Sequence, residues 1–167
     1  MTGLQGSQVF DSKSTFISAC EEARQRGDRR VGTDHLLLAL LHDSRIEGIV
    51  GVGNGQARAA LKRIDKEALA AVGLPSSLDV PPLRERALPS RSTLHNAWRQ
   101  HMKISPSARR ALREFGPKLR VRMPASPQQL LASLLENQPP DPAAVLLDAL
   151  GVDRVALRQR LEADQDS

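Results

Sequence analysis

VGTDHLLLALL, residues 31–41, is the longest apolar run of the chain and the stretch that decides its fold. Thr33 can cap a helix by accepting a hydrogen bond from a backbone N–H one turn on, and Asp34 suits the positive end of that helix. Every residue from Leu36 to Leu41 except Ala39 is leucine, so much of this helix must face protein. The run is too short to span a bilayer.

The same run returns in the second half of the chain as QQLLASLL, residues 128–135. At an offset of 94 the leucines Leu36, Leu37, Leu40 and Leu41 fall on Leu130, Leu131, Leu134 and Leu135. At an offset of 100, apolar positions of 46–61 match those of 146–161, and Gly51 matches Gly151. A repeated apolar helix predicts two related halves, each covering the apolar face of the other.

Composition favours a small helical protein. The 167 residues are enough for one domain or for two small repeats packed as one. Hydrophobic residues make up 40% and aromatic residues 2%, so Leu and Ala must build the core, and both favour helices. Cys20 is the single cysteine and residues 1–7 lack a signal-peptide pattern, so we expect a protein of the reducing cytoplasm.

Capping residues and helix breakers predict four helices in each half. In the first half these are 12–26, the 31–41 run, a short helix after Asp43, and 56–72 with Asn54 as its cap. In the second half, Ser-Pro or Asp-Pro pairs predict helices that begin at Pro106, Pro127 and Pro142, and a fourth follows Asp153. The predicted segments are a loose N-terminus (1–11), a first repeat (12–72), a linker (73–103), a second repeat (104–161) and a tail (162–167).

The linker, 73–103, is basic and rich in Pro and Ser. It contains Trp98, the single tryptophan, which we expect to anchor the linker to the body; a partner-facing aromatic is the alternative. The net charge of +5 and a sequence pI of about 10.1 allow nucleic acid or acidic partners.

The first half resembles a known family. EEARQRG, residues 21–27, followed by VGTDHLLLALL, is similar to the E-E-A…G…I-G-T-E-H-x-L-L-x-L-L pattern in the N-terminal domain of the Clp ATPases. SPSARR, residues 105–110, resembles the T-P-x-A-K/R-K/R of the same family. The resemblance covers most of residues 10–161. It implies an all-α bundle of eight helices, built from two four-helix repeats related by a pseudo-two-fold axis.

The resemblance also implies a function. In this family the domain is a non-catalytic docking module on an ATP-driven unfoldase, where it receives adaptors and substrates. Because the chain has no G-x-x-x-x-G-K-[S/T] motif, it resembles a stand-alone ClpC-like N-domain without AAA+ modules. The implied role is that of an adaptor, a decoy or a ligand sink in Clp-dependent proteolysis. Its partners would be a Clp ATPase, the adaptors or the substrates.

In the ClpC-like branch this domain binds phosphoarginine marks, and the implied site falls on Thr33, Asp34 and His35 in the first half and on Ser105 and Gln128 in the second. Asp34 is one methylene shorter than the Glu of the family. Gln128 replaces the acid by a neutral amide, which offers a guanidinium no charge. Phosphoarginine binding, if any, is therefore expected in the first half. The alternative is that Thr33 and Asp34 only cap their helix.

The sequence does not indicate an enzyme, a cofactor or a metal site. His35 and His42 lie about two turns (~10 Å) apart on one helix, too far for one metal ion without other ligands. Two further functions stay open. The basic linker and the arginines of 109–122 allow nucleic-acid binding, although a solvated basic face is favoured because the stretch lacks interleaved aromatics. The second open function is that of a small-ligand sensor, which would use the groove between the halves.

Overall fold

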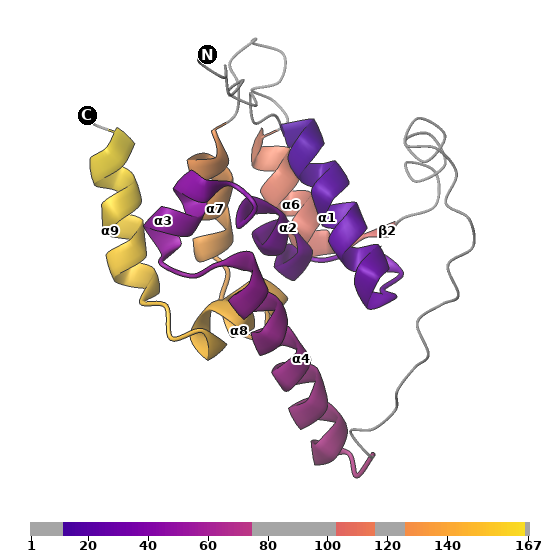
Figure 1. Ribbon diagram of the computed structural model, residues 1–167. Helices are drawn as coiled ribbons and strands as arrows, with labels where there is room; N and C mark the ends of the chain where they lie inside the picture. Colours follow the sequence, from indigo (N-terminus) through magenta and orange to yellow (C-terminus); the bar gives the residue numbers. More distant parts are fainter. Residues whose placement is uncertain (1–11, 75–102, 116–125, 166–167) are drawn as a thin grey trace, which may run out of the picture.

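The computed structural model describes residues 12–74, 103–115 and 126–165, which form eight helices and two very short strands (Figure 1). In chain order the elements are α1 (Ser12–Arg26), β1 (Arg30–Val31), α2 (Thr33–Leu40), α3 (Ser44–Val50), α4 (Asn54–Ala71), β2 (Lys103–Ile104), α6 (Pro106–Phe115), α7 (Pro127–Leu135), α8 (Pro142–Ala149) and α9 (Arg154–Gln165). The predicted all-α architecture is confirmed. None of the helices in these ranges is long and apolar enough to cross a membrane.

The helices of the second half begin where the capping pattern predicts. Pro106, Pro127 and Pro142 are the first residues of α6, α7 and α8. Before α8, the Asp141 carboxylate accepts a hydrogen bond from the backbone N–H of Ala143 at 3.1 Å. Proline suits the first helical position because its φ is already helical and its missing N–H would have no partner there.

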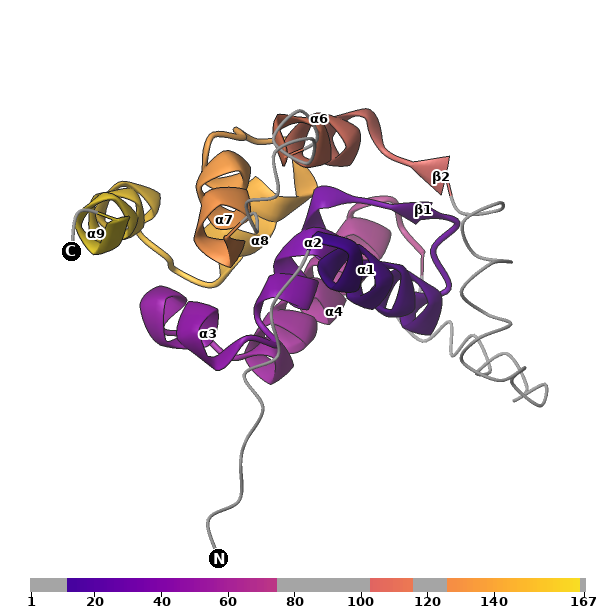
Figure 2. The same ribbon diagram turned by 90° about the horizontal axis from the view of Figure 1, so that it is seen from above.

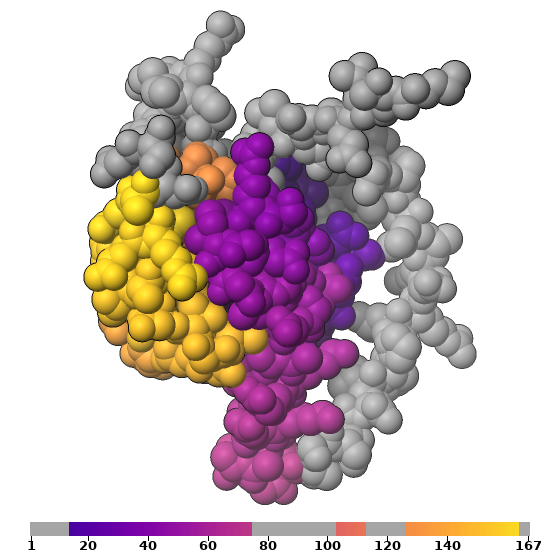
Figure 3. All heavy atoms as spheres, turned by 60° about the vertical axis from the view of Figure 1, so that its left-hand side comes forward, coloured from indigo at the N-terminus to yellow at the C-terminus, as the bar shows by residue number. Residues whose placement is uncertain are grey.

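The two halves pack as a repeat. Under the 94 and 100 offsets, α2 corresponds to α7, α3 to α8, and α4 to α9. In the structure, α4 packs against α8 and α3 packs against α9. These two contacts are equivalent under the repeat, as a two-fold relation requires. Figure 3 shows α9 of the second half directly against α3 of the first. Gly51 and Gly151, which follow α3 and α8, both have positive φ, a conformation that favours glycine.

The helix α2 is the centre of the core. It packs against α1, α4, α6, α7 and α8, and Figure 2 shows it in the middle of the molecule. Leu37 and Leu131, which occupy equivalent repeat positions, are both fully buried, and Leu41 and Leu135 are nearly so. All four leucines therefore belong to the core.

A two-residue parallel pairing joins the halves beside α2. Arg30 lies opposite Lys103 and Val31 opposite Ile104. The backbone N–H of Ser105 then donates to the Val31 carbonyl at 2.9 Å. The start of the second repeat is therefore held next to the start of α2. Strands of this length leave no alternating pattern in the sequence, and the sequence did not predict them.

Two predicted helix caps are wrong. Gly32 occupies the N-cap position of α2, and Thr33 is already inside the helix. Asn54 is the first residue of α4, whose N-cap position is Gly53. The Asn54 side-chain amide donates instead to the Leu38 carbonyl at 2.8 Å. In both places the side chain forms a hydrogen bond with a residue distant in the sequence instead of capping its own helix.

Several predictions lie outside the described residues. They concern the loose N-terminus, nearly all of the 73–103 linker with Trp98, and the arginines of 118–122. The proposed segment boundaries stay predictions.

Candidate functional site

The five residues that the family pattern selected lie in three places. Thr33, Asp34 and His35 form the first turn of α2 and are all buried. Ser105 precedes α6, and its hydrogen bond to Val31 brings it close to that turn. Gln128 is half-buried on the first turn of α7. Among the described residues, no hydrogen bond joins Gln128 to the other four.

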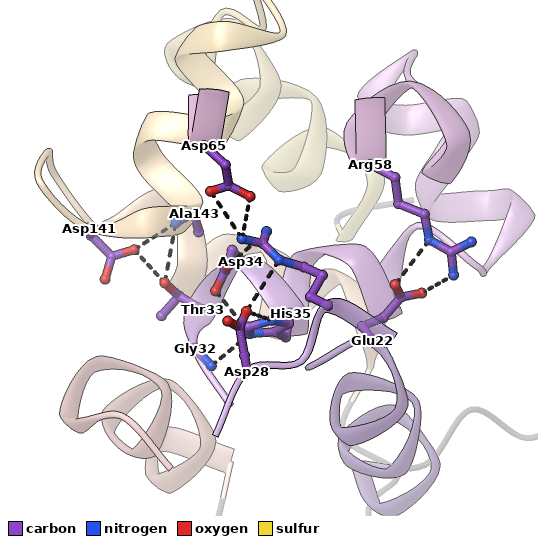
Figure 4. Close-up of polar contacts among 11 residues, drawn as sticks. Glu22, Asp28, Gly32, Thr33, Asp34, His35, Arg58, Asp65, Asp141 and Ala143 are labelled. Carbon is purple, nitrogen blue, oxygen red and sulfur yellow. Dashed lines mark hydrogen bonds and ion pairs between the residues drawn. The ribbon is translucent and has the colours of Figure 1, made fainter. Parts of the chain in front are cut away.

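Thr33 connects the two halves of the molecule. Its hydroxyl donates to Oδ1 of Asp141 at 2.7 Å and accepts from the backbone N–H of Ala143 at 3.2 Å (Figure 4). It therefore helps to cap α8, in the other repeat, rather than its own helix. The side chain is fully buried, and the hydroxyl proton is already donated within the protein.

Asp34 belongs to a cluster that surrounds one guanidinium. Nη1 of Arg26 lies 3.6 Å from Oδ2 of Asp34, and its Nε lies 3.2 Å from Oδ2 of Asp28. Nη2 of Arg26 donates to both carboxylate oxygens of Asp65, at 3.0 and 3.2 Å. Figure 4 labels the three carboxylates, Asp28, Asp34 and Asp65. The cluster thus joins the end of α1, the start of α2 and the middle of α4.

The electrostatics of the cluster keep Asp34 ionised. Burial by itself would raise the pKa of this carboxyl. The hydrogen bond and the charge of His35, together with the charge of Arg26, outweigh burial and lower the pKa below its ordinary value. The negative charge of Asp34 is therefore stabilised by groups of the protein itself.

His35 closes the first turn of α2. Its Nδ1 lies 3.0 Å from the backbone nitrogen of Gly32 and 3.2 Å from Oδ1 of Asp34. The neutral ring accepts from Gly32 at Nδ1, whereas the protonated ring donates from Nδ1 to Asp34. Nε2 lies 3.0 Å from Oδ2 of Asp28. The ring of His35 therefore helps to cap α2.

The two second-half residues differ from each other. The hydroxyl of Ser105 accepts from the backbone N–H of Ala108 at 3.1 Å and so caps α6. Gln128 has no such part: α7 is capped by Ser126, whose hydroxyl accepts from the N–H of Gln129 at 3.3 Å. Among the described residues of the second repeat, no ion pair corresponds to that of Asp34 with Arg26.

A second charged cluster lies between α1 and α4, and the sequence analysis missed it. Glu22 is buried and binds Arg58 through both oxygens, at 2.6 and 3.0 Å. Its Oε1 also lies 2.8 Å from Nε2 of His42. Burial would raise the pKa of Glu22, but the bonds and charges of Arg58 and His42 outweigh it and lower the pKa. The helical pattern of 12–26 places Glu22 on the polar side, and this is wrong, because its partner Arg58 comes from a helix 36 residues away.

Two shallow cavities on the described surface share Arg110. One, of about 330 Å³, is lined by Arg110, Ala111, Ser133, Glu136 and Asn137. The other, of about 370 Å³, is lined by Ile104, Pro106, Arg109 and Arg110. None of the five predicted site residues lines either cavity.

The described residues offer little reactive chemistry. Burial raises the pKa of the Cys20 thiol to about 11, which keeps it protonated and poorly nucleophilic at neutral pH. Within the described ranges, no three His, Cys, Asp or Glu side chains are grouped so as to hold a metal ion.

The fold is similar to a solved structure, the crystal structure of the N-terminal domain of the caseinolytic protease associated chaperone ClpD from Arabidopsis thaliana. The likeness has a TM-score of 0.59 with 21% sequence identity, and it covers 99% of this chain and 100% of that chain. At this identity it shows a shared fold. No family model and no curated protein matches the sequence.

Proposed function

We propose that this chain is a non-catalytic docking module that binds protein or peptide partners of a Clp-type unfoldase in the cytoplasm, as an adaptor, a decoy or a ligand sink. The observation that carries the proposal is the likeness of fold to the ClpD N-terminal domain along the whole of both chains. The 31–41 motif and the internal repeat support it independently, because they come from the sequence and not from the fold.

In this proposal the first turn of α2 stabilises the fold and does not bind the partner. A phosphoarginine ligand would need the Thr33 hydroxyl for its phosphate and the Asp34 carboxylate for its guanidinium. Thr33 already binds Asp141 and Ala143, and Asp34 already faces the guanidinium of Arg26. An incoming guanidinium would have to displace Arg26 from three carboxylates. We therefore expect partners to bind at the outer surface rather than at this turn.

Affinity capture tests the proposal. The full chain would be immobilised and exposed to native extract of the source cells at physiological salt, and bound proteins identified by mass spectrometry. We expect enrichment of a Clp ATPase, its adaptor or its substrates over a control column that carries a helical protein of similar size and charge. Purified unfoldase and peptidase with the chain added then separate the roles, because an adaptor speeds substrate degradation and a decoy slows it.

The main alternative is tested in parallel. A gel-shift titration on random DNA at rising salt would show steeply salt-dependent binding if the basic residues bind nucleic acid. Capture of nucleic acid together with failure to enrich any Clp component would overturn the docking proposal.

A further inference from the structure

The 330 Å³ cavity lies between α6 and the end of α7, and polar side chains from both helices line it. Arg110 comes from α6, and Asn137 follows the last turn of α7. The volume is at the lower end of the range for ligand sites, which suits one side chain of a partner better than a cofactor.

Asn137 has an unused hydrogen-bond donor. Its side chain is 8% exposed, and its Oδ1 accepts from Nη2 of Arg110 at 3.2 Å. Its backbone carbonyl accepts from Nη1 of Arg154 at 2.8 Å. Within the described part of the chain, Nδ2 of Asn137 is buried without a partner. A buried amide donor without an acceptor is unfavourable, so an acceptor brought by a ligand would stabilise it.

The charge around the cavity favours an anion. Glu136 is paired with Arg158 at 3.2 Å, and Arg154 is paired with Asp148 at 3.2 Å. Arg110 is exposed, and its contact in the described structure is with a neutral amide. Arg158 also lies 3.4 Å from Glu162, whereas Arg110 has no carboxylate partner among the described residues. A guanidinium and an amide N–H on adjacent side chains match the two oxygens of a carboxylate.

We propose that this cavity binds the side-chain carboxylate of a Glu or Asp in a peptide segment of the partner. Arg110 takes one oxygen and Nδ2 of Asn137 the other. The inference rests on the proposed docking function and names the chemistry of one contact. Chain-end carboxylates are captured by clustered backbone N–H groups, whereas the donors here are side chains, which favours an internal acidic residue. Because Nδ2 is closed to solvent, the carboxylate can reach it only when the side chains that cover it move aside.

An NMR titration of the full-length ¹⁵N-labelled chain tests this contact. The probe is the capped tripeptide acetyl-Ala-Glu-Ala-amide, and the comparison peptide has Gln in place of Glu. The readout is the side-chain NH₂ pair of Asn137, which is identified by its disappearance in the Asn137→Ala spectrum. We expect the Glu peptide to shift this pair saturably and the Gln peptide to leave it in place.

Two substitutions on one helix provide the matched control. Arg110→Gln should weaken binding of the Glu peptide about ten- to a hundred-fold, the usual effect of losing one charge-assisted bond. Arg109→Gln removes the same charge from a neighbouring position that lines only the other cavity, and it should change the affinity less than about two-fold. Circular dichroism would confirm that both variants are folded.

Three results would overturn the inference: no shift of the Asn137 amide at millimolar peptide, equal shifts with the Gln peptide, or equal losses in the two arginine variants. A stronger response to acetyl-Ala-Ala, which has a free chain end and no acidic side chain, would also overturn it. Failure here is distinguishable from failure of the docking function. If Arg110→Gln still captures Clp components from extract, the function stands and this contact is wrong.

Discussion

Replacing Thr33 by valine should loosen the polar contact between the two repeats. Valine keeps the volume and the β-branch of threonine, so the packing around this buried position is preserved. The substitution removes the hydroxyl that donates to Asp141 at 2.7 Å and accepts from Ala143 at 3.2 Å. Ala143 keeps its bond to Asp141, so the main loss is one hydrogen bond to a carboxylate. Such bonds contribute about 1.5–3 kcal/mol.

The assay is urea unfolding at pH 7, followed by far-ultraviolet circular dichroism. The free energy of unfolding should fall by about 1.5–3 kcal/mol in Thr33→Val. A double-mutant cycle with Asp141→Asn isolates the contact, and the two changes should be clearly less than additive. Ser105→Ala is the control within one repeat. It removes the cap of α6 at a typical cost of about 1 kcal/mol and should add independently to Thr33→Val.

Two outcomes would refute this reasoning. A loss below about 0.5 kcal/mol in Thr33→Val would mean that the hydroxyl makes no net contribution, since surface changes alone reach that size. Full additivity with Asp141→Asn would mean that the two side chains are not coupled. Either result would return Thr33 to the candidates for ligand binding.

Four further predictions follow from the same contacts. Leu131→Ala removes a fully buried side chain and should lower the free energy of unfolding by about 2–5 kcal/mol in the urea assay; a loss below about 1 kcal/mol would remove α7 from the core. In Gly32→Ala the new Cβ would collide with the Asp34 carboxylate, so calorimetry should show a lower Tm, and an unchanged Tm would contradict the geometry. Folding lowers the pKa values of Glu22 and Asp34. Their ionised carboxylates therefore add to the free energy of unfolding above the ordinary values of 4.5 and 3.8, and this contribution is lost as the pH falls below them. Urea titrations between pH 7 and pH 3 should therefore show a smaller fall in Glu22→Gln than in wild type. Titration calorimetry with phosphoarginine should give no binding heat with wild type, whereas Arg26→Ala should gain binding; binding by wild type that Asp34→Ala abolishes would restore the family site.

The candidate site shows which contacts a local sequence pattern cannot predict. The sequence identified Thr33, Asp34 and His35 as one polar turn at the start of a buried helix, and that placement is confirmed. It assigned Thr33 to its own helix because a capping rule considers only the next few residues. The partner that the structure provides, Asp141, is 108 residues away. Arg26 and Asp65, 39 residues apart, form their ion pair only because α1 and α4 fold together.

The sequence by itself determined the helices, the repeat and the core. Leucine spacing, Ser-Pro and Asp-Pro pairs, and glycines such as Gly51 act within a turn or two of the chain, so they can be interpreted without a partner. The tertiary structure alone decided which polar groups are free to bind. It enclosed Asp34 with an arginine from another helix and left Nδ2 of Asn137 without a partner among the described residues. A polar side chain binds whichever complementary group lies within hydrogen-bond distance, and that distance is set by helix packing rather than by sequence separation.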